Sequence, residues 1–558
     1  MKTLRELIEK KIYDHLEHFV SLADAGGENT EMFGIRVFDE SEKFVQGAMV
    51  KATVTLYVHY LKTGDNRADM ALERVRRAVK IAISDRIKTW GKLSVLRAMC
   101  QLHKAGLMDV ICQEDMEELK RRTDYEDFFD KEKMQVINLP TNYLQVAMAC
   151  AGYRELIGWD TEPMCEKIRD RLLEIIEASS TSGYMDEDPP MARFDRYSIL
   201  VSSEIADTLN DLGMEVPVSV LSNISDAMKI SCAMANEKGD GINYGRSLSC
   251  HGDGATLEIL STAFANGLVP GKDKDVALLY SIRIAEKILS FWYDEERKSF
   301  NIWWDGRSTN RYRQVKRVLE VNLDMANHML TTLANFEKAG LADELPAIDR
   351  LPCPEGWVAT EMKFLDAGER VAKTVVLRRK NTLAMLPLVG LGNRYRDSSY
   401  MPYPAICGVL ESAPEGRYPF LVPEYTTDDG RILRPLQFYS SVNTSEENGI
   451  VTVVARGKLA LYGEKQPAAS EYQFVSEYVF DGDTITANFD TDLIYEKASM
   501  LVGTRGDSAT ISTFGFDECK EEQVEGEYDF MTPSGAIQRA VTHIAKSVSR
   551  LSYRVSLE

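Results

Sequence analysis

The segment from Asn243 to Glu258 concentrates side chains that can bind anions and move protons. Its reactive residues are Tyr244, Arg246, His251, Asp253 and Glu258. Three glycines in it allow the backbone to turn sharply and to approach a ligand closely. Because an apolar run follows Gly254, the segment predicts a polar loop that leads into a buried helix, a common place for binding and catalytic groups. For each residue taken singly, ordinary decoration of a surface loop is the alternative.

Each of these side chains has a definite chemical use. Arg246 can hold a carboxylate through two parallel hydrogen bonds. Tyr244 or His251 can carry a proton. Asp253 can act as a carboxylic acid on a glycosidic oxygen, although capping of the following helix explains this residue equally well. The segment therefore predicts an acid–base site for an anionic substrate.

Two other stretches carry groups that suit the same kind of substrate. In residues 138–143, Asn142 can offer its amide to a substrate carboxylate, whereas Thr141 can cap the helix that follows. In residues 300–313, two tryptophans can stack on sugar rings beside charged groups, or they can belong to a structural hairpin with one ring in and one out. The candidates of that stretch are Trp303, Trp304, Asp305, Arg307 and Arg311.

A fourth stretch, residues 184–197, places acids before an expected helix. Asp195 and Tyr197 stand at the helix entry and are the better candidates, although Asp195 can be only a cap. Three other acids fit a solvated loop as well as a catalytic role, and they are Asp186, Glu187 and Asp188.

Loops that combine acids, aromatic rings and arginines indicate a carbohydrate substrate, and an acidic sugar in particular needs the arginines. The formal charge of −20, with 86 acidic against 66 basic residues, argues against nucleic acid as a partner. It does not exclude an anionic small molecule, because a local arginine cluster can override the global field. The seven histidines are dispersed and form no metal motif, so we expect neither a metal nor another cofactor.

With 558 residues, the chain is longer than one hydrophobic core usually supports. Residues 1–345 show helical periodicity and are expected to form the catalytic domain. No sequence repeat is detectable, which makes a solenoid array less suitable, whereas twelve helices in six hairpins match an (α/α)6 toroid. The expected helices are 1–24, 45–61, 70–83, 90–105, 113–121, 141–158, 161–178, 197–212, 216–236, 254–266, 273–296 and 311–339.

Residues 355–558 change in character and alternate β-branched, aromatic and polar positions. Asp481-Gly482 lies between two such runs and is a hairpin signal. We therefore predict an α+β multidomain protein in which an antiparallel β-sandwich follows the toroid. Packing, an active-site wall or a dimer surface are equally open roles for that second domain, so a homo-oligomer is possible.

The N-terminal residues are charged throughout and lack the apolar core of a signal peptide. No apolar run approaches the length needed to span a bilayer. The nine cysteines form no regular framework, which fits reduced thiols. These features together predict a cytoplasmic protein without a membrane partner.

The segment Tyr244-Gly-Arg-Ser-Leu248, with Asp195-x-Tyr197 before it, resembles a bacterial family of largely uncharacterised toroid proteins that has been linked to β-glucuronidase activity. The layout is also similar to that of heparinase II/III-type and alginate-type polysaccharide lyases, which join an (α/α) toroid to a β-sandwich. Two features depart from this picture. Gly252-Asp-Gly254 is closer to an Asp-Gly element of the lyases, and most enzymes that attack intact polymers carry an export signal.

The resemblance implies cleavage of uronate-containing oligosaccharides, and three hypotheses remain. Hydrolysis at a glucuronate-like residue is the first choice and needs two carboxyl groups, for which Asp195, Asp253 and Glu187 are candidates. β-Elimination needs the uronate carboxylate neutralised and a base and an acid in place. Its candidates are Asn142, Arg246, Tyr244, Tyr197 and His251. A non-catalytic saccharide-binding protein is the third hypothesis, and it would need the aromatic rings but not the titratable cluster.

Overall fold

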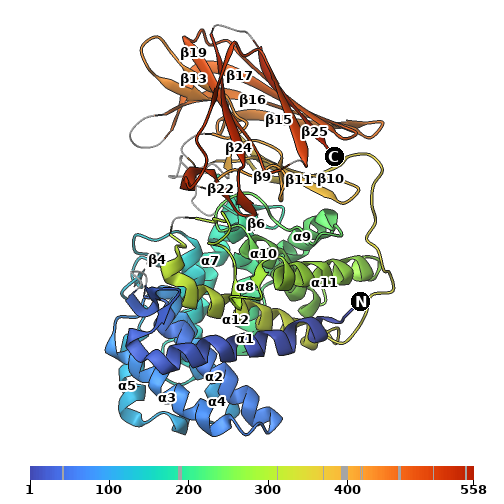
Figure 1. Cartoon of the computed structure of the whole chain (residues 1–558). Coiled ribbons are helices and arrows are strands. Elements are labelled where there is room, and N and C mark those ends of the chain that lie inside the picture. Colours follow the sequence, from blue (N-terminus) through green and yellow to red (C-terminus); the bar gives the residue numbers. More distant parts are fainter. Residues whose placement is uncertain are drawn as a thin grey trace.

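The computed structural model describes the chain except residues 40–42, 187–191, 311, 368–369, 391–399, 415, 417–418, 463–466, 507 and 547–549, and it leaves the side chains of 179–181 and 366–367 undescribed. A helical domain occupies the lower part of Figure 1, and a β-rich domain lies above it. The predicted order of a helical toroid followed by a β-rich domain is therefore confirmed.

The described residues form twelve α-helices that alternate between an outer and an inner layer. The inner helices are α2 (Val45–Thr63), α4 (Thr89–Ala105), α6 (Asn142–Leu156), α8 (Arg196–Leu212), α10 (Cys250–Ala265) and α12 (Val318–Lys338). The outer helices are α1 (Leu4–Gly26), α3 (Ala68–Ser84), α5 (Gln113–Arg122), α7 (Met164–Ser179), α9 (Val218–Met234) and α11 (Lys274–Ser290). Each inner helix contacts the next, and α12 contacts α2, so the inner ring is closed.

The burial of each helix follows from its sequence. On α3 the buried positions recur every three or four residues, as in Ala71, Val75, Ala78 and Ala82, so only one face is apolar and the helix lies outside. On α10 every residue from Cys250 to Phe264 is buried, as an inner helix requires. Apolar periodicity therefore determines the layer of each helix.

Two inner helices begin four or more residues away from the predicted start. α10 begins at Cys250, four residues before the predicted start, because Gly252 packs within the helix: a Cβ there would lie 2.3 Å from the carbonyl oxygen of Ile242. His251 and Asp253 consequently lie on the first turn of α10 rather than in a loop. α12 begins at Val318 after a short 3-10 turn, so the end of the 300–313 stretch is not helical.

Four connections from an outer helix to the following inner helix contain a short hairpin whose two strands are two residues long each. These are β1–β2 (Glu31–Met32, Ile35–Arg36), β3–β4 (Phe129–Asp130, Gln135–Val136), β5–β6 (Ser180–Thr181, Tyr184–Met185) and β7–β8 (Tyr293–Asp294, Ser299–Phe300). Three of the polar stretches flagged in the sequence include or directly follow such a hairpin. The hairpins thus deliver these stretches to the starts of α6, α8 and α12.

The β-rich domain contains two main antiparallel sheets. The smaller sheet has the order β12-β11-β10-β9 and comprises β9 (Val358–Ala367), β10 (Arg370–Arg379), β11 (Thr382–Leu388) and β12 (Ala405–Ile406). The larger sheet has the order β20-β25-β18-β17-β16-β14-β13-β19-β24-β21, and β15 pairs with β16. Its strands are β13 (Glu424–Thr426), β14 (Ile432–Arg434), β15 (Tyr439–Glu447), β16 (Ile450–Tyr462), β17 (Ala468–Asp481), β18 (Thr484–Thr491), β19 (Lys497–Thr504), β20 (Ala509–Phe514), β21 (Glu518–Glu521), β24 (Arg539–Ala545) and β25 (Arg550–Leu557). A separate hairpin pairs β22 (Met531–Thr532) with β23 (Gly535–Ala536).

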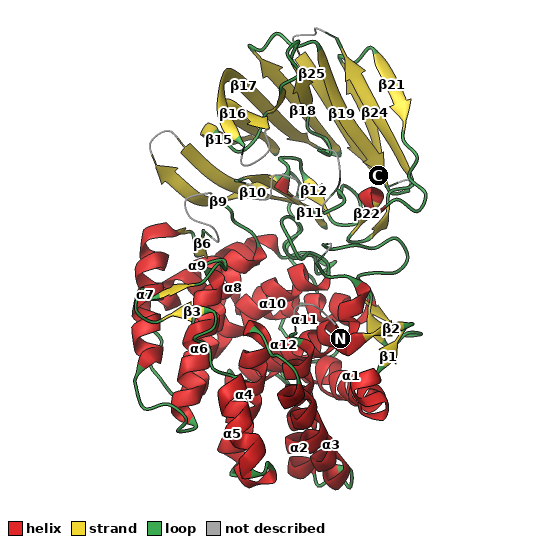
Figure 2. Cartoon of the chain, turned by 90° about the vertical axis from the view of Figure 1, so that its left-hand side faces the viewer, coloured by secondary structure: helices red, strands yellow, loops and turns green. Residues whose placement is uncertain are grey.

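The smaller sheet lies between the helical domain and the larger sheet in both views (Figures 1 and 2). Two neighbouring residues of β10 contact the helical domain and the larger sheet respectively, because successive side chains of a strand point to opposite faces. The Thr374 hydroxyl donates to Tyr244 of the helical domain at 3.0 Å, whereas the Lys373 amine donates to the Val442 carbonyl of β15 at 3.0 Å. The predicted hairpin at Asp481-Gly482 joins β17 to β18.

Among the described residues, no helix combines the length and apolar composition needed to cross a bilayer.

Replacing Gly47 with alanine is expected to destabilise the protein. The new Cβ on α2 would lie 1.9 Å from the carbonyl oxygen of Gly91 on α4. Overpacking of this kind costs about 1–3 kcal/mol, so we expect the apparent Tm to fall by several degrees in thermal unfolding followed by circular dichroism. Gly271→Ala is the matched control, because no atom lies within 4 Å of its added Cβ. Equal Tm values for the two variants would contradict the close crossing.

Candidate active site

A cavity of about 540 Å³ lies among the starts of the inner helices. Residues from α4, α8 and α12 line it, together with the loops before α6, α10 and α12. Its apolar lining includes Phe44, Trp90, Leu93, Leu139 and Tyr143. Its polar lining includes Asn142, Arg196, Tyr197, Arg246, Tyr312 and Arg313. Three predicted site residues, Asn142, Tyr197 and Arg246, therefore meet in one cavity, and their roles in binding remain predictions.

Arg246 is held in the cavity wall by its neighbours. Its guanidinium lies over the Tyr197 ring at 4.2 Å, and its Nε lies 3.4 Å from Oδ2 of Asp195. The preceding residue, Gly245, has a φ of +87°, and a Cβ there would lie 2.6 Å from Cβ of Asp195. Only glycine fits this close approach, which brings the loop before α10 against the start of α8.

Asp195 lies behind the cavity wall and is not among the lining residues. It is buried and caps α8, because its Oδ1 accepts a hydrogen bond from the Tyr197 amide at 2.8 Å. Its Oδ2 accepts a hydrogen bond from the Tyr400 hydroxyl of the β-rich domain. The helix-cap alternative therefore describes its geometry, and its carboxylate positions Arg246.

The Ser247 hydroxyl joins the two phenols of the cavity. It lies 3.1 Å from the Tyr197 hydroxyl, contacts the Tyr312 hydroxyl, and accepts from Nε of Arg313 at 3.3 Å. Ser247 and Ser249 have φ values of +56° and +70°, a region that non-glycine residues rarely adopt. Strain of this kind persists where the surroundings enforce it, and it is concentrated at functional sites.

The two phenols differ in acidity. Burial opposes ionisation of Tyr312, but the adjacent charges of Arg313 and Arg246 outweigh it and lower the pKa of this phenol to about 8. Burial instead raises the pKa of Tyr197. Near neutral pH, Tyr312 can therefore serve as a base while Tyr197 keeps its proton.

The cavity carries a local excess of positive charge. Among the described residues, five arginines and His328 line it, against three carboxylic acids. Within the described part of the chain, Nε and Nη1 of Arg196 and Nη1 of Arg313 have no hydrogen-bond partner, although all three atoms are buried. The Oδ1 atom of Asn142, which can only accept, is likewise buried without a hydrogen-bond partner among these residues. Buried donors are normally satisfied, so these guanidinium groups suit an anionic ligand.

Acidic residues line the deeper part of the cavity around His328. Nδ1 of His328 lies 2.6 Å from Glu258, and its Nε2 lies 3.5 Å from Asp324. Burial disfavours the imidazolium, but the two carboxylates outweigh it and raise the pKa of His328 to about 10. Burial also raises the pKa of Glu204 to about 7, against the opposing charge of Arg97. No group of three or more potential metal ligands exists among the described residues.

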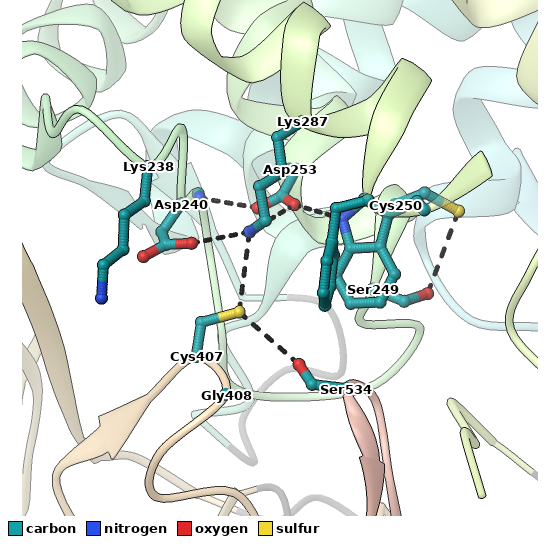
Figure 3. A network of polar contacts seen from close by, with 12 residues as sticks. Lys238, Asp240, Ser249, Cys250, Asp253, Lys287, Cys407, Gly408 and Ser534 are labelled. Atoms are coloured by element: carbon teal, nitrogen blue, oxygen red, sulfur yellow. Dashed lines mark hydrogen bonds and ion pairs between the residues drawn. The ribbon is translucent and has the colours of Figure 1, made fainter. Parts of the chain in front are cut away.

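Asp253 belongs to a different network, which lies between α10, α11 and the β-rich domain (Figure 3). Its Oδ1 accepts from the Gly241 amide at 2.7 Å, and its Oδ2 accepts from Nε1 of Trp292 at 2.6 Å. The Lys287 amine lies 2.8 Å from Asp253 and 2.7 Å from Asp240. Because α10 begins at Cys250, Asp253 points to this network and does not line the cavity.

Tyr244 and His251 are also placed away from the cavity. Tyr244 is buried and accepts the hydrogen bond of Thr374, and burial raises the pKa of its phenol. His251 is buried with its Nδ1 2.9 Å from the sulfur of Met325, and burial lowers its pKa well below the ordinary value. Neither residue, although predicted from the sequence as a proton carrier, is among the lining residues of this cavity.

The tryptophan pair supports the cavity loop from outside. Nε1 of Trp303 donates to the carbonyl oxygen of Arg313, and the Trp304 ring meets Phe33 edge-on at 4.8 Å. Neither ring is among the cavity-lining residues. Arg311 and Glu187 lie outside the described residues.

Sequence reasoning missed several residues of the cavity. Arg196, Tyr312 and Arg313 stand inside the quoted stretches, beside residues that were singled out. Their arginine and tyrosine types were the available signal. Glu204 and His328 carry no such signal, because each lies inside a helix and reaches the cavity only through the toroidal arrangement.

No known family model matches the sequence, and no curated protein is similar to it. Among solved structures, the chain is similar to a chondroitin AC lyase of Streptomyces coelicolor A3 in complex with chondroitin sulphate, with 11% identity and a TM-score of 0.54 over 98% of this chain and 79% of that chain. A possible member of the GH105 family from Salmonella enterica covers 57% of this chain and 94% of its own, with 13% identity and a TM-score of 0.38. Heparinase III covers 99% of this chain and 92% of its own, with 10% identity and a TM-score of 0.28. At these identities, the first likeness shows a shared fold.

Replacing Tyr400 with phenylalanine is expected to raise the pKa of Tyr312 above its value of about 8. The change removes the hydroxyl that donates to Asp195, so this carboxylate would draw the Arg246 guanidinium away from the phenol. Alkaline titration of phenolate absorbance measures the shift, with each protein compared with its own Tyr312→Phe derivative. Tyr403→Phe is the matched control, because its hydroxyl donates to Ser412 within the β-rich domain. An unchanged pKa in Tyr400→Phe would contradict this positioning role.

Proposed function

We propose that the cavity binds the uronate of an acidic oligosaccharide and cleaves the adjacent glycosidic bond by β-elimination. The observation that carries this proposal is the Tyr312 phenol, which is made acidic by Arg313 and Arg246 at the edge of a cavity with unpartnered guanidinium donors. A base beside an anion site is what elimination at a uronate requires.

Substrate binding supplies the first part of this chemistry. Arg196 and Arg313 can donate to the uronate carboxylate through their unpartnered guanidinium atoms. Asn142 lines the same cavity and can complete the set only through its Nδ2. Their hydrogen bonds withdraw charge from the carboxylate and make the proton on C5 more acidic. The arginines thus act both in recognition and in stabilising the enolate-like transition state.

Proton transfer is the second part. The Tyr312 phenolate accepts the C5 proton, the C5–H electron pair forms the C4–C5 double bond, and the bond from C4 to the leaving oxygen breaks. Tyr197, whose pKa is raised by burial, can donate the proton that the leaving oxygen needs. The Ser247 hydroxyl touches both phenols, so it can return a proton from Tyr312 to Tyr197.

Two of the three carboxylic acids predicted for hydrolysis do not support that mechanism at this cavity, and the third, Glu187, lies outside the described residues. Asp195 and Asp253 lie outside the lining, and protein donors occupy both oxygens of each. The fold shared with a chondroitin AC lyase agrees with elimination but does not determine the reaction.

Hydrolysis remains a second candidate because of Glu204. This residue lines the cavity, and its pKa of about 7 keeps a large fraction protonated near neutral pH, as a general acid needs. Asp324 lines the same cavity and, with His328 beside it, stays ionised because its pKa is lowered. An acid and an ionised carboxylate are the minimum set for a glycoside hydrolase.

The nine cysteines are all free thiols. This state suits a reducing compartment, and it supports the proposal that the protein acts on imported oligosaccharides in the cytoplasm.

Replacing Tyr312 with phenylalanine is expected to lower kcat by about a thousandfold, because the variant lacks the base, and to leave KM little changed. The assay follows the ultraviolet absorbance of unsaturated uronates with a panel of uronate-bearing oligosaccharides. Wild-type activity should rise with pH through about 8 as the phenol ionises, and Tyr403→Phe should keep full activity. Cleavage by the wild type without an absorbance rise would exclude elimination.

If hydrolysis is the reaction, replacing Glu204 with glutamine should lower cleavage by at least about a hundredfold, because the general acid is lost. Reducing-end analysis measures cleavage by either mechanism, and wild-type product should then show no unsaturated uronate. Under elimination, the same variant should keep most of its activity. A variant of Tyr312 or Glu204 that keeps saccharide affinity while the wild type turns over no panel member would favour a binding protein.

A further inference from the structure

A second, smaller cavity lies next to the main one, between the inner helices α2, α4 and α12. It has a volume of about 20 Å³ and shares four wall residues with the main cavity, namely Ala48, Ser94, Asp324 and Asn327. The remaining polar residues of its wall are Lys51 and Thr55. A cavity of this size holds about one water molecule or a similarly small ligand.

Lys51 is an unusual residue for such a place. Only 9% of its surface is exposed, and its amine makes no hydrogen bond or ion pair with any described residue. Burial, together with the positive charge of Arg97, lowers the pKa of this amine to about 7. A large fraction of Lys51 is therefore the uncharged amine near neutral pH, which is the nucleophilic form.

Two further polar side chains of the small cavity lack partners. Neither the Ser94 hydroxyl nor the Asn327 amide makes a hydrogen bond with any described residue. Arg97 follows Ser94 by one helical turn on α4 and so lies on the same face. Lysine, serine and asparagine can all donate hydrogen bonds, so the three residues in the wall of the small cavity suit a ligand that accepts them.

We propose that Lys51 is a carbamylation site that takes up carbon dioxide. The lone pair of Nζ forms a bond to the carbon of CO₂, one C=O electron pair moves onto oxygen, and Nζ releases a proton to solvent. The product is a carbamate, whose two oxygens accept hydrogen bonds from Ser94 and Asn327. No oxidant or reductant is needed, and the step is reversible.

The size of the cavity selects this reagent. An aldehyde of an open-chain sugar could also react with an amine, but about 20 Å³ leaves no room for a sugar chain. Carbon dioxide is a linear molecule of three atoms and is the small electrophile that suits this space.

The surrounding charge accommodates the new anion. Asp324 is the one acidic residue in the wall, and the imidazolium of His328 lies 3.5 Å from it. The charges that act on Asp324 also include Arg313 and Arg196. These cations offset the charge of the Asp324 carboxylate, which would otherwise repel a carbamate at Lys51.

The carbamate should become more populated as pH rises, because the reaction consumes the neutral amine and releases a proton. The groups that face the Lys51 amine act in both directions. Arg97 favours the neutral amine, while the acidic groups oppose it. Those acidic groups are Cys100 on α4, Asp211 on α8 and Asp324 on α12.

Nuclear magnetic resonance of the full chain tests the proposal without an activity assay. Protein labelled with ¹⁵N-lysine is equilibrated with ¹³C-bicarbonate at pH 8, and the carbon signal of a carbamate should appear with a one-bond coupling to ¹⁵N. We expect about one carbamate per chain, falling several-fold at pH 6. Lys51→Met should abolish the signal, whereas Lys62→Met, at an exposed position of the same helix, should leave it intact.

Two results would overturn the proposal. One is the absence of a ¹⁵N-coupled carbon in the wild type, including the case in which only uncoupled, bound bicarbonate appears. The other is persistence of the coupled signal in Lys51→Met. Should that variant fail to fold, Ser94→Ala keeps the amine and removes one donor, and carbamate occupancy should then fall several-fold. Because none of these measurements uses a saccharide, they stand apart from the test of β-elimination.

Discussion

The candidate site depends on one buried carboxylate, that of Asp195. It caps α8, meets the Arg246 guanidinium at 3.4 Å and accepts from Tyr400 of the β-rich domain. A buried carboxylate is stable only when its oxygens are satisfied, so these three segments are forced together. The position of Arg246, and through it the acidity of Tyr312, follows from that junction. The β-rich domain thereby takes part in the site, although none of its described side chains lines the cavity.

The net charge of the cavity lining is opposite in sign to the net charge of the whole molecule. The chain carries a formal charge of −20, yet arginines outnumber carboxylic acids among the described residues that line the cavity. Burying guanidinium donors without partners is unfavourable, and an anionic ligand removes that penalty when it binds. Arg313 is one of these cations and also lowers the pKa of Tyr312, so one guanidinium contributes to anion binding and to the ionised fraction of the phenol. This arrangement supports the proposed binding of a carboxylate and removal of the proton next to it.

Helical and strand periodicity made the toroid and the β-rich domain predictable, because burial on one face imposes a period that can be counted in the sequence. The same reasoning located the three cavity stretches that hold Asn142, Tyr197 and Arg246. This reasoning failed at the start of α10, where an extra turn of helix changes the direction in which the side chains point. α10 begins at Cys250, since Gly252 packs inside the helix, and this rotates His251 and Asp253 away from the cavity. A helix start set by tertiary packing leaves no clear signal in residue types, and neither do residues such as His328 that meet the cavity from within a helix.

The depth of each titratable group distinguishes the two reactions. Tyr312 lies beside Arg313 and Arg246, where positive charge lowers the pKa of an acid, while Glu204 lies near Glu258, where burial and like charge raise it. A uronate bound by the arginines would therefore present its C5 proton to the phenol rather than to the carboxyl group. Glu204 could act only on a glycosidic oxygen that reaches deeper into the toroid. In either reaction the uronate carboxylate must stay bound to the arginines. The shorter distance that the substrate has to extend from there to Tyr312 than to Glu204 is an argument for the proposed elimination.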